Sequence, residues 1–361
     1  MTPVQPLRIG YSTLRDDPTG PGDRRRFCRY ADQRKLPWEI ARPERTYDVV
    51  VSSVGGDLSS WRRLPRQTKF VFDVVDAYLS APGADARAPW RGLFKYLTGH
   101  TRHLHLDFRQ LIIDCLRRAD AVICCTEEQR ESIRPYCANV HEILDIQSEA
   151  VRHAKQDYAR GERFQLVWEG LALNLHTFRA IAGPLRSLGA RYPIALHLVT
   201  DLECPRGSTY LWKRPTRAVV REVLGMDHVY LHEWNADLLS AVATGCDLAV
   251  IPIPLDVPFL RGKPENKLVL FWRMGMPVVT SATPAYERAM RAAGLSMTCR
   301  TQEEWFALLE RLMLDEDLRR QAGIRGAAHA EAAYGEAGLL AKWDDVFQSV
   351  LGERGAGCRG S

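Results

Sequence analysis

The sequence predicts an α/β protein made of two successive doubly wound, Rossmann-like domains. Short apolar runs alternate with helical patterns along most of the 361 residues, and parallel strands need crossover helices of this kind. A polar stretch at 147–163 interrupts the alternation, which starts again at Phe164. A chain of this length also exceeds what one core usually holds. We therefore expect two domains, followed by a C-terminal helix with a frayed tail; the predicted ranges are 1–150, 151–335 and 336–361.

Six strands are expected in the first domain, because six short runs are rich in aliphatic and aromatic residues. Between the first two, Asp23 is expected to cap a helix in which Phe27, Tyr30 and Ala31 share one face. The predicted strands are 7–12, 38–41, 47–53, 69–75, 120–126 and 140–145.

The second domain repeats the pattern, and residues 302–351 are expected to be helical with a short connection at 315–318. Two doubly wound domains would face a central cleft with the carboxyl ends of their strands, where ligands bind in such folds. The predicted strands are 164–170, 194–200, 228–234, 246–253, 277–281 and 295–299.

The composition is typical of a globular enzyme, with 46% hydrophobic and 26% charged residues. A net charge of +5 suits an anionic substrate but is too dilute for a nucleic-acid-binding protein. Nine cysteines without a C-x-x-C pair indicate a reduced, cytoplasmic protein, and no metal site is expected. No apolar run reaches the roughly 18 residues that a transmembrane helix needs.

The stretch RGKPENKLVLFWRMGMPVVTS, residues 261–281, places two lysines at the start of a predicted helix. A helix N-terminus carries about half a positive charge and unpaired N–H groups, so phosphate binds there. Lys263 and Lys267 would add point charges at the same place. The pattern therefore predicts a phosphate site, with solvated lysines as the alternative, and Gly275 is expected to end the helix.

Pro264, Asn266, Lys267 and Leu268 form a Pro-x-Asn-Lys-Leu pattern after the run CDLAVIPI, and RADAVICCTEEQRESI lies in the first half. These motifs resemble GT-B glycosyltransferases, specifically glycosyltransferase family 4. The resemblance implies transfer of a sugar from a nucleotide-diphosphate donor to an acceptor hydroxyl, with retention and without a metal or other cofactor. A glycan or lipid-linked acceptor is implied in the same way. The implied donor-binding residues are Lys263, Asn266, Lys267, Glu265, Gly170 and Glu233.

Two glutamates usual in this family are missing, because Leu270 and Gly262 stand at their positions. Either Glu169 or Glu233 holds the ribose, or the donor differs, or activity has been lost. A sugar-nucleotide epimerase of the same fold and a non-catalytic binding subunit are the alternatives from other functional classes.

The run DVVD ends the fourth predicted strand of the first domain, where Asp76 is the leading catalytic candidate and Asp73 the second. A carboxylate there could bind an acceptor hydroxyl or stabilise positive charge on the sugar; helix capping is the alternative. The loop after the first strand could bring Gly20, Gly22 and Arg24 to a phosphate of donor or acceptor, unless its arginines form a solvated helix face.

Residues 89–104 interleave apolar and basic side chains, as does a helix that lies on an anionic membrane. Ordinary core packing is the alternative. On the membrane interpretation the protein would be cytoplasmic, peripheral at the inner membrane face, with a lipid-linked acceptor.

Overall fold

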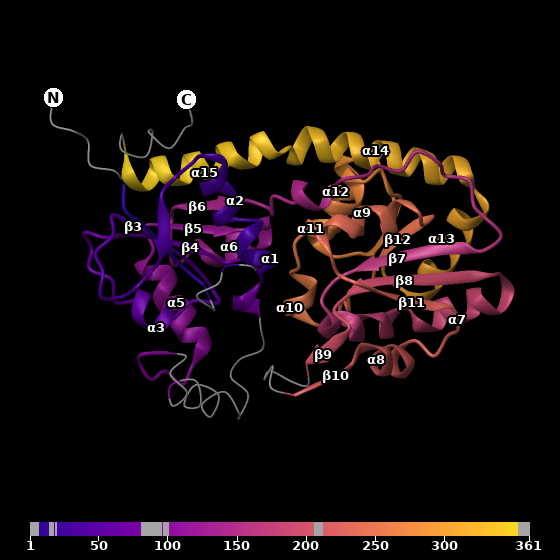
Figure 1. Ribbon diagram of the computed structural model, residues 1–361, viewed down its shortest axis with the longest axis horizontal. Helices are drawn as coiled ribbons and strands as arrows, with labels where there is room; N and C mark the ends of the chain where they lie inside the picture. The colour runs from indigo at the N-terminus through magenta and orange to yellow at the C-terminus, as the bar shows by residue number, and fades with distance from the viewer. Residues whose placement is uncertain are drawn as a thin grey trace. The chain divides into compact units, whose positions relative to one another are not determined.

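The computed structural model describes residues 7–13, 18, 20–80, 96, 101–205 and 212–352. The chain divides into two compact units, each of which contains a parallel sheet (Figure 1). Unit 1 comprises Met1–Ile146, Gly262–Pro264 and Glu336–Ser361, and unit 2 comprises Gln147–Arg261 and Glu265–Gly335.

The sheet of unit 1 has six described strands in the order β2-β1-β3-β4-β5-β6, and every pair is parallel. Its central strands are buried on both faces, as their continuous runs of valine, phenylalanine and isoleucine require. The strands are β1 (Ile9–Ser12), β2 (Trp38–Ile40), β3 (Val49–Ser53), β4 (Lys69–Asp73), β5 (Ala121–Cys124) and β6 (Val140–Glu142).

The C-terminal helix α15 (Glu336–Leu351) belongs to unit 1, where it packs on α2 (Phe27–Gln33). Trp343 stacks on Tyr30 with ring centroids 5.4 Å apart, and Asp344 accepts hydrogen bonds from Tyr30 and Arg34. The other described helices of unit 1 are α1 (Pro21–Arg24), α3 (Leu58–Trp61), α5 (Phe108–Arg118), α6 (Glu127–Ile133) and the 3₁₀ helix η1 (Tyr78–Ser80).

The sheet of unit 2 also has six described parallel strands, in the order β11-β8-β7-β12-β13-β14. The strands β9 (Glu203–Pro205) and β10 (Lys213–Pro215) pair antiparallel in a separate two-stranded sheet. The strands of the sheet are β7 (Phe164–Glu169), β8 (Ile194–Thr200), β11 (Val229–Glu233), β12 (Leu248–Ile251), β13 (Val278–Ser281) and β14 (Thr298–Cys299).

Helix α11 (Asn266–Arg273) is the element that the lysine-rich stretch predicted, and Leu268 to Trp272 are all buried. The helix ends at Arg273, and Gly275, two residues later, has a left-handed φ of 70°. The N–H of Gly275 bonds to the carbonyl of Trp272 and that of Met276 to the carbonyl of Phe271, which is a Schellman motif. This end turns the chain into β13.

Nine further helices of unit 2 are described. They are η2 (Ser148–Ala150), η3 (Ala172–Ala180), α7 (Ala182–Arg191), α8 (Thr216–Val223), α9 (Ala236–Thr244), α10 (Pro258–Arg261), α12 (Pro284–Ala292), α13 (Gln302–Leu314) and α14 (Glu316–Tyr334).

The sequence locates every strand of the two parallel sheets but overextends most of them by one to three residues at an end. It misses β9 and β10, because their residues, Glu-Cys-Pro and Lys-Arg-Pro, contain no apolar run. The connection expected at 315–318 is a single residue, Asp315, which accepts a hydrogen bond from the backbone N–H of Leu318 and so caps α14.

Asp23 does not cap a long helix, contrary to the prediction. It lies inside the four-residue helix α1, and its carboxylate accepts hydrogen bonds from the Tyr11 and Thr13 hydroxyls at 2.6 and 2.7 Å. These buried or half-buried hydroxyls need an acceptor, so the carboxylate binds them in place of a helix N-terminus.

Candidate functional site

The first group of site residues lies in unit 2, at the carboxyl ends of β7 and β11. Glu169 is the last residue of β7 and is 7% exposed. The indole N–H of Trp234, the residue after β11, donates to Glu169 Oε1 at 3.0 Å. This edge is where open parallel sheets bind ligands, so Glu169 is a buried carboxylate at a ligand-binding edge.

Glu265 brings a second buried carboxylate to unit 2, immediately before α11. It is 4% exposed, and the Tyr334 hydroxyl donates to its Oε1 at 3.3 Å. Both carboxylates act on the fully buried phenol of Tyr286, whose pKa is raised by burial, then by Glu265 and then by Glu169. Glu265 is therefore a second buried carboxylate of unit 2, hydrogen-bonded to the Tyr334 hydroxyl.

Lys267 places its ammonium against the same edge. Its Nζ lies 4.8 Å from the ring centroid of Trp168, a cation–π distance. A Cβ added to Gly170 would lie 2.3 Å from that Nζ and 2.7 Å from the Trp168 ring. Only glycine leaves this space open at 170, so Gly170 permits the position of the Lys267 ammonium.

Two further residues that the sequence assigns to the donor are placed in unit 2 as well. Asn266 is the first residue of α11 and is half-buried, and Glu233 is the exposed last residue of β11. Leu270, by contrast, is fully buried in the middle of α11. The place where the resembled family carries a ribose-binding glutamate is therefore a core position here.

The second group of site residues lies in unit 1. Asp76 follows β4, and its Oδ1 pairs with Lys263 Nζ at 3.0 Å, with both side chains about a quarter exposed. The sequence groups Lys263 with Lys267 around one phosphate. In the structure, Lys263 belongs to unit 1, where it contacts Asp76, and Lys267 belongs to unit 2, where it lies over Trp168.

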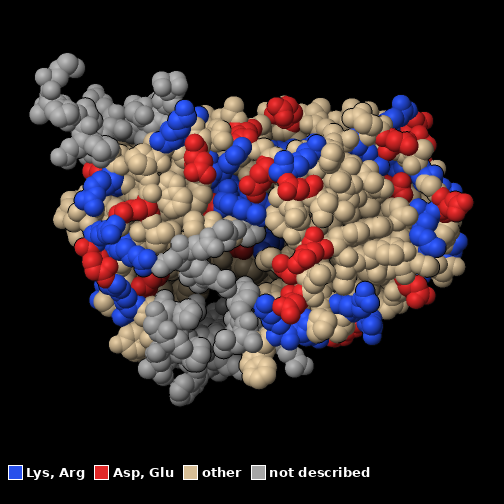
Figure 2. Space-filling model, viewed as in Figure 1, with Lys and Arg blue, Asp and Glu red and all other residues tan. Residues whose placement is uncertain are grey.

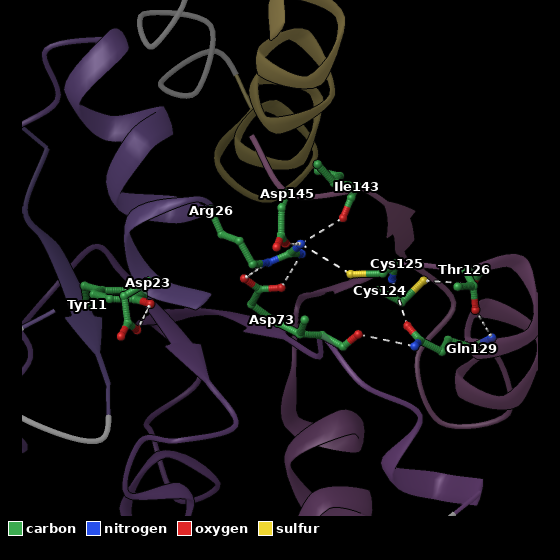
Figure 3. A network of polar contacts seen from close by, with 11 residues as sticks. Tyr11, Asp23, Arg26, Asp73, Cys124, Cys125, Thr126, Gln129, Ile143 and Asp145 are labelled. Carbon is green, nitrogen blue, oxygen red and sulfur yellow. Dashed lines mark hydrogen bonds and ion pairs between the residues drawn. The ribbon is translucent and has the colours of Figure 1, made fainter. Parts of the chain in front are cut away.

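Both carboxylate oxygens of Asp73 are bound by a buried arginine, which argues against its predicted catalytic role. Its two oxygens accept from Arg26 Nε and Nη2 at 2.7 and 2.6 Å, and neither side chain is more than 1% exposed. Arg26 Nη1 also donates to Asp145, Ile143 and Cys125 (Figure 3). A carboxylate bound on both oxygens by a buried arginine is poorly placed to exchange protons with a substrate.

Burial and neighbouring charges shift the pKa values of Arg26 and Asp145 in opposite directions. Burial alone lowers the pKa of Arg26, but Asp73, Cys125 and Asp145 raise it well above its ordinary value, so the guanidinium stays charged. Burial raises the pKa of Asp145 although Arg26 opposes the change. The network therefore holds a permanent buried cation at the carboxyl ends of β4, β5 and β6.

The predicted phosphate loop is described in part, because residues 14–17 and 19 lie outside the described chain. The carbonyl of Gly20 accepts from the backbone N–H groups of Asp23 and Arg24, so Gly20 and Gly22 form the turn that starts α1. The alternative of a solvated arginine face is wrong for Arg25 and Arg26, which are 5% and 0% exposed.

Two side chains that the sequence does not assign to the donor or acceptor contribute to these groups: Trp168 and Trp234. Trp234 stands at the end of a predicted strand, so the rule that ligands bind at carboxyl ends could have found it. Trp168 could not be found in this way, because its role depends on a tertiary contact between its ring and the Lys267 ammonium.

Comparison with known proteins agrees with this architecture. The Anabaena protein HepE in complex with UDP has a TM-score of 0.64 at 11% identity, over 95% of this chain and 100% of that one. Sucrose-phosphate synthase from Thermosynechococcus elongatus has a TM-score of 0.59 at 12% identity, over 84% of this chain and 74% of that one. The chain has the GT-B fold. No family model matches the sequence, and no curated protein matches it.

A pocket of about 680 Å³ lies elsewhere in this GT-B chain, at the amino ends of β7, β8 and β11. Arg163, Arg186 and Arg191 line it, but Arg186 bonds to the carbonyl of Leu224 and Arg191 lies over the Phe306 ring. These contacts give Arg186 and Arg191 structural partners. The pocket also lies at the edge of the sheet opposite Glu169. We therefore place the candidate donor site at the carboxyl edge.

Most of the segment proposed to contact a membrane, 89–104, lies outside the described residues. Among the helices that are described, none combines the length and the apolar character needed to span a bilayer. Figure 2 shows acidic and basic side chains interspersed over the visible face of both units.

Proposed function

We propose that this GT-B protein is a glycosyltransferase of the family 4 type, which transfers a sugar from a nucleotide-diphosphate donor to an acceptor hydroxyl. The observation that carries the proposal is the placement of Lys267 at the N-terminus of α11, held over Trp168 and against Gly170. Helix N–H groups and an ammonium together bind phosphate. The UDP bound to HepE supports a nucleoside diphosphate as the ligand class.

The residues of unit 2 have distinct roles in this proposal. Lys267 and the first N–H groups of α11 stabilise the charge that develops on the diphosphate as the sugar leaves, without a metal. Asn266 donates to the same group. Glu169 and Glu265 accept hydrogen bonds from hydroxyls of the ribose or the sugar, in place of the glutamate that Leu270 replaces, and Glu233 stands at the outer rim.

Asp76 of unit 1 is the proposed catalytic carboxylate, which acts on the acceptor hydroxyl or stabilises the positive charge on the sugar. Its ion pair with Lys263 orients the carboxylate before substrate arrives. The proposal includes retention of the anomeric configuration. The proposed acceptor is a polysaccharide or a lipid-linked glycan, and the proposed location is cytoplasmic.

The first test is calorimetric titration with UDP, GDP, ADP, CMP and dTDP, each with and without magnesium. We expect one nucleoside diphosphate to bind without the metal. In Lys267→Ala we expect its affinity to fall by about 1.5 to 3 kcal/mol, the usual value for a hydrogen bond to a charged group. That is roughly a 10- to 150-fold increase in Kd.

Lys213→Ala is the matched control, because Lys213 is an exposed lysine of unit 2 that pairs with Glu203. Its affinity for the diphosphate should equal that of the wild type. Equal affinity in folded Lys267→Ala would contradict the donor site. Conversion of a nucleotide sugar in the absence of any acceptor would favour the epimerase over the transferase.

A further inference from the structure

One buried side chain, Gln129 on α6, joins three segments of unit 1. Its Oε1 accepts from the backbone N–H of Cys125 at 2.8 Å. Its Nε2 donates to the carbonyls of Val75 and Gly262, both at 3.3 Å. Gln129 is 3% exposed, so these bonds give both the oxygen and the NH₂ group of the amide protein partners in a place that excludes water.

The orientation of this amide follows from its partners. Cys125 offers a donor, whereas Val75 and Gly262 both offer acceptors. An amide rotated by 180° would place its N–H groups against an N–H and its oxygen against two carbonyls. The arrangement therefore fixes which carbonyls the NH₂ group holds, and the Cys125 N–H anchors the side chain beside β5 (Figure 3).

The two carbonyls belong to the residues that immediately precede Asp76 and Lys263. The side chains of these two residues form the ion pair of 3.0 Å. Asp76 and Lys263 can pair only if their two backbone segments are placed correctly. The NH₂ group of Gln129 bonds to a carbonyl of each segment. A pair that is this exposed contributes little unless its geometry is set in advance.

We propose that Gln129 is a positioning residue, whose side-chain amide sets the Asp76–Lys263 ion pair by holding the carbonyls of Val75 and Gly262. The amide fixes the spacing of the two backbones, and the ion pair then orients the Asp76 carboxylate. The consequence for turnover rests on the proposed function of Asp76, but the positioning of the pair does not.

The test is competitive acylation of lysines in the intact protein, followed by mass spectrometry. A lysine held by a carboxylate acylates more slowly than a free one, so the rate at Lys263 relative to Lys213 and Lys342 reports the ion pair. Asp76→Asn calibrates the full effect, expected as an increase of about two- to five-fold. Gln129→Met should give an increase in the same range.

The combined variant Gln129→Met with Asp76→Asn distinguishes positioning from general loosening. If Gln129 acts through the pair, the combined variant acylates at Lys263 no faster than Asp76→Asn alone. Ser132→Ala is the matched control: it removes a hydrogen bond on α6, from Ser132 Oγ to the Gln129 carbonyl, and should leave the rate at Lys263 unchanged.

An unchanged rate in Gln129→Met, or an equal gain with and without Asp76, would overturn the proposal. Should Gln129→Met not fold, Gln129→Asn decides, because it keeps the amide but lacks the reach to both carbonyls. No nucleotide is present in this experiment. A failure of diphosphate binding would therefore refute the proposed function and leave the labelling result intact.

Discussion

Two ion pairs of unit 1 involve the aspartates of the DVVD run, and they differ in how much free energy is lost when each pair is broken. The Arg26–Asp73 pair is buried and bidentate, and breaking such a pair typically costs about 3 to 5 kcal/mol because a charge is left unpaired. The Asp76–Lys263 pair is about a quarter exposed, and pairs of this kind contribute roughly 0 to 1 kcal/mol. Asp76 can therefore separate from Lys263 at low cost, whereas separating Asp73 from Arg26 is costly.

Gly170 is the residue at which packing and binding are most directly linked in unit 2. In Gly170→Ala the added Cβ would meet Lys267 Nζ at 2.3 Å, so the ammonium must move. Overpacking of this kind costs about 1 to 3 kcal/mol. We expect the affinity for the nucleoside diphosphate to fall, as measured by calorimetric titration.

Gly161→Ala provides the comparison, because a Cβ at Gly161 meets no atom within 4 Å. Its affinity and melting temperature should match those of the wild type. Undiminished diphosphate affinity in Gly170→Ala would show that the Lys267 ammonium does not need its observed position.

At the scale of elements, α11 and α14 approach each other closely through glycine. A Cβ at Gly326 of α14 would lie 2.3 Å from the Trp272 ring of α11, and one at Gly323 would lie 2.3 Å from the Gly275 carbonyl. Trp272 is fully buried. Because α11 carries Asn266 and Lys267 at its start, its packing on α14 also holds the candidate donor site.

Gly326→Ala tests this packing. The side chain would collide with a ring that is surrounded on all sides, so we expect the free energy of unfolding to fall by about 1 to 3 kcal/mol in chemical denaturation.

Gly338→Ala, in α15, is the matched change in open space, since its Cβ would meet nothing within 4 Å. It should stabilise by about 0.5 to 1 kcal/mol, the usual difference between alanine and glycine in a helix. A Gly326→Ala variant as stable as the wild type would mean that α11 and α14 separate at low cost.

At the scale of the whole molecule, stability should depend on pH through a histidine pair. His197 Nδ1 and His232 Nε2, on adjacent strands, are 2.9 Å apart. Burial, then the neighbouring His232, lowers the pKa of His197, and burial lowers the pKa of His232. Lowered folded pKa values favour the neutral rings, so this stabilisation is present above pH of about 6.5 and is lost as the pH falls through the folded values.

Thermal melting at pH 8 and pH 5 measures this contribution. His232→Gln removes one titrating ring and its effect on the other, so its melting temperature should fall less between the two pH values than that of the wild type. The exposed His153, changed to glutamine, is the control and should keep the wild-type difference. An equal fall in all three proteins would remove the histidine pair as the cause.

The fold could be predicted from the sequence to a large extent, because strands such as β8 show their hydrophobic run and their boundaries locally. The candidate site could be predicted only where one short segment carries it. Asn266 and Lys267 at a helix start and Asp76 at a strand end are visible in this way. Their roles are still predictions.

What the sequence alone determined is the alternation of strands and helices, since periodicity and turn residues act within a few positions. Only the tertiary structure decided the partners. Trp234 reaches Glu169 across 65 positions, Arg26 reaches Asp145 across 119, and Lys263 reaches Asp76 across 187. Such contacts depend on how the whole sheet orders its strands, and no local pattern encodes them.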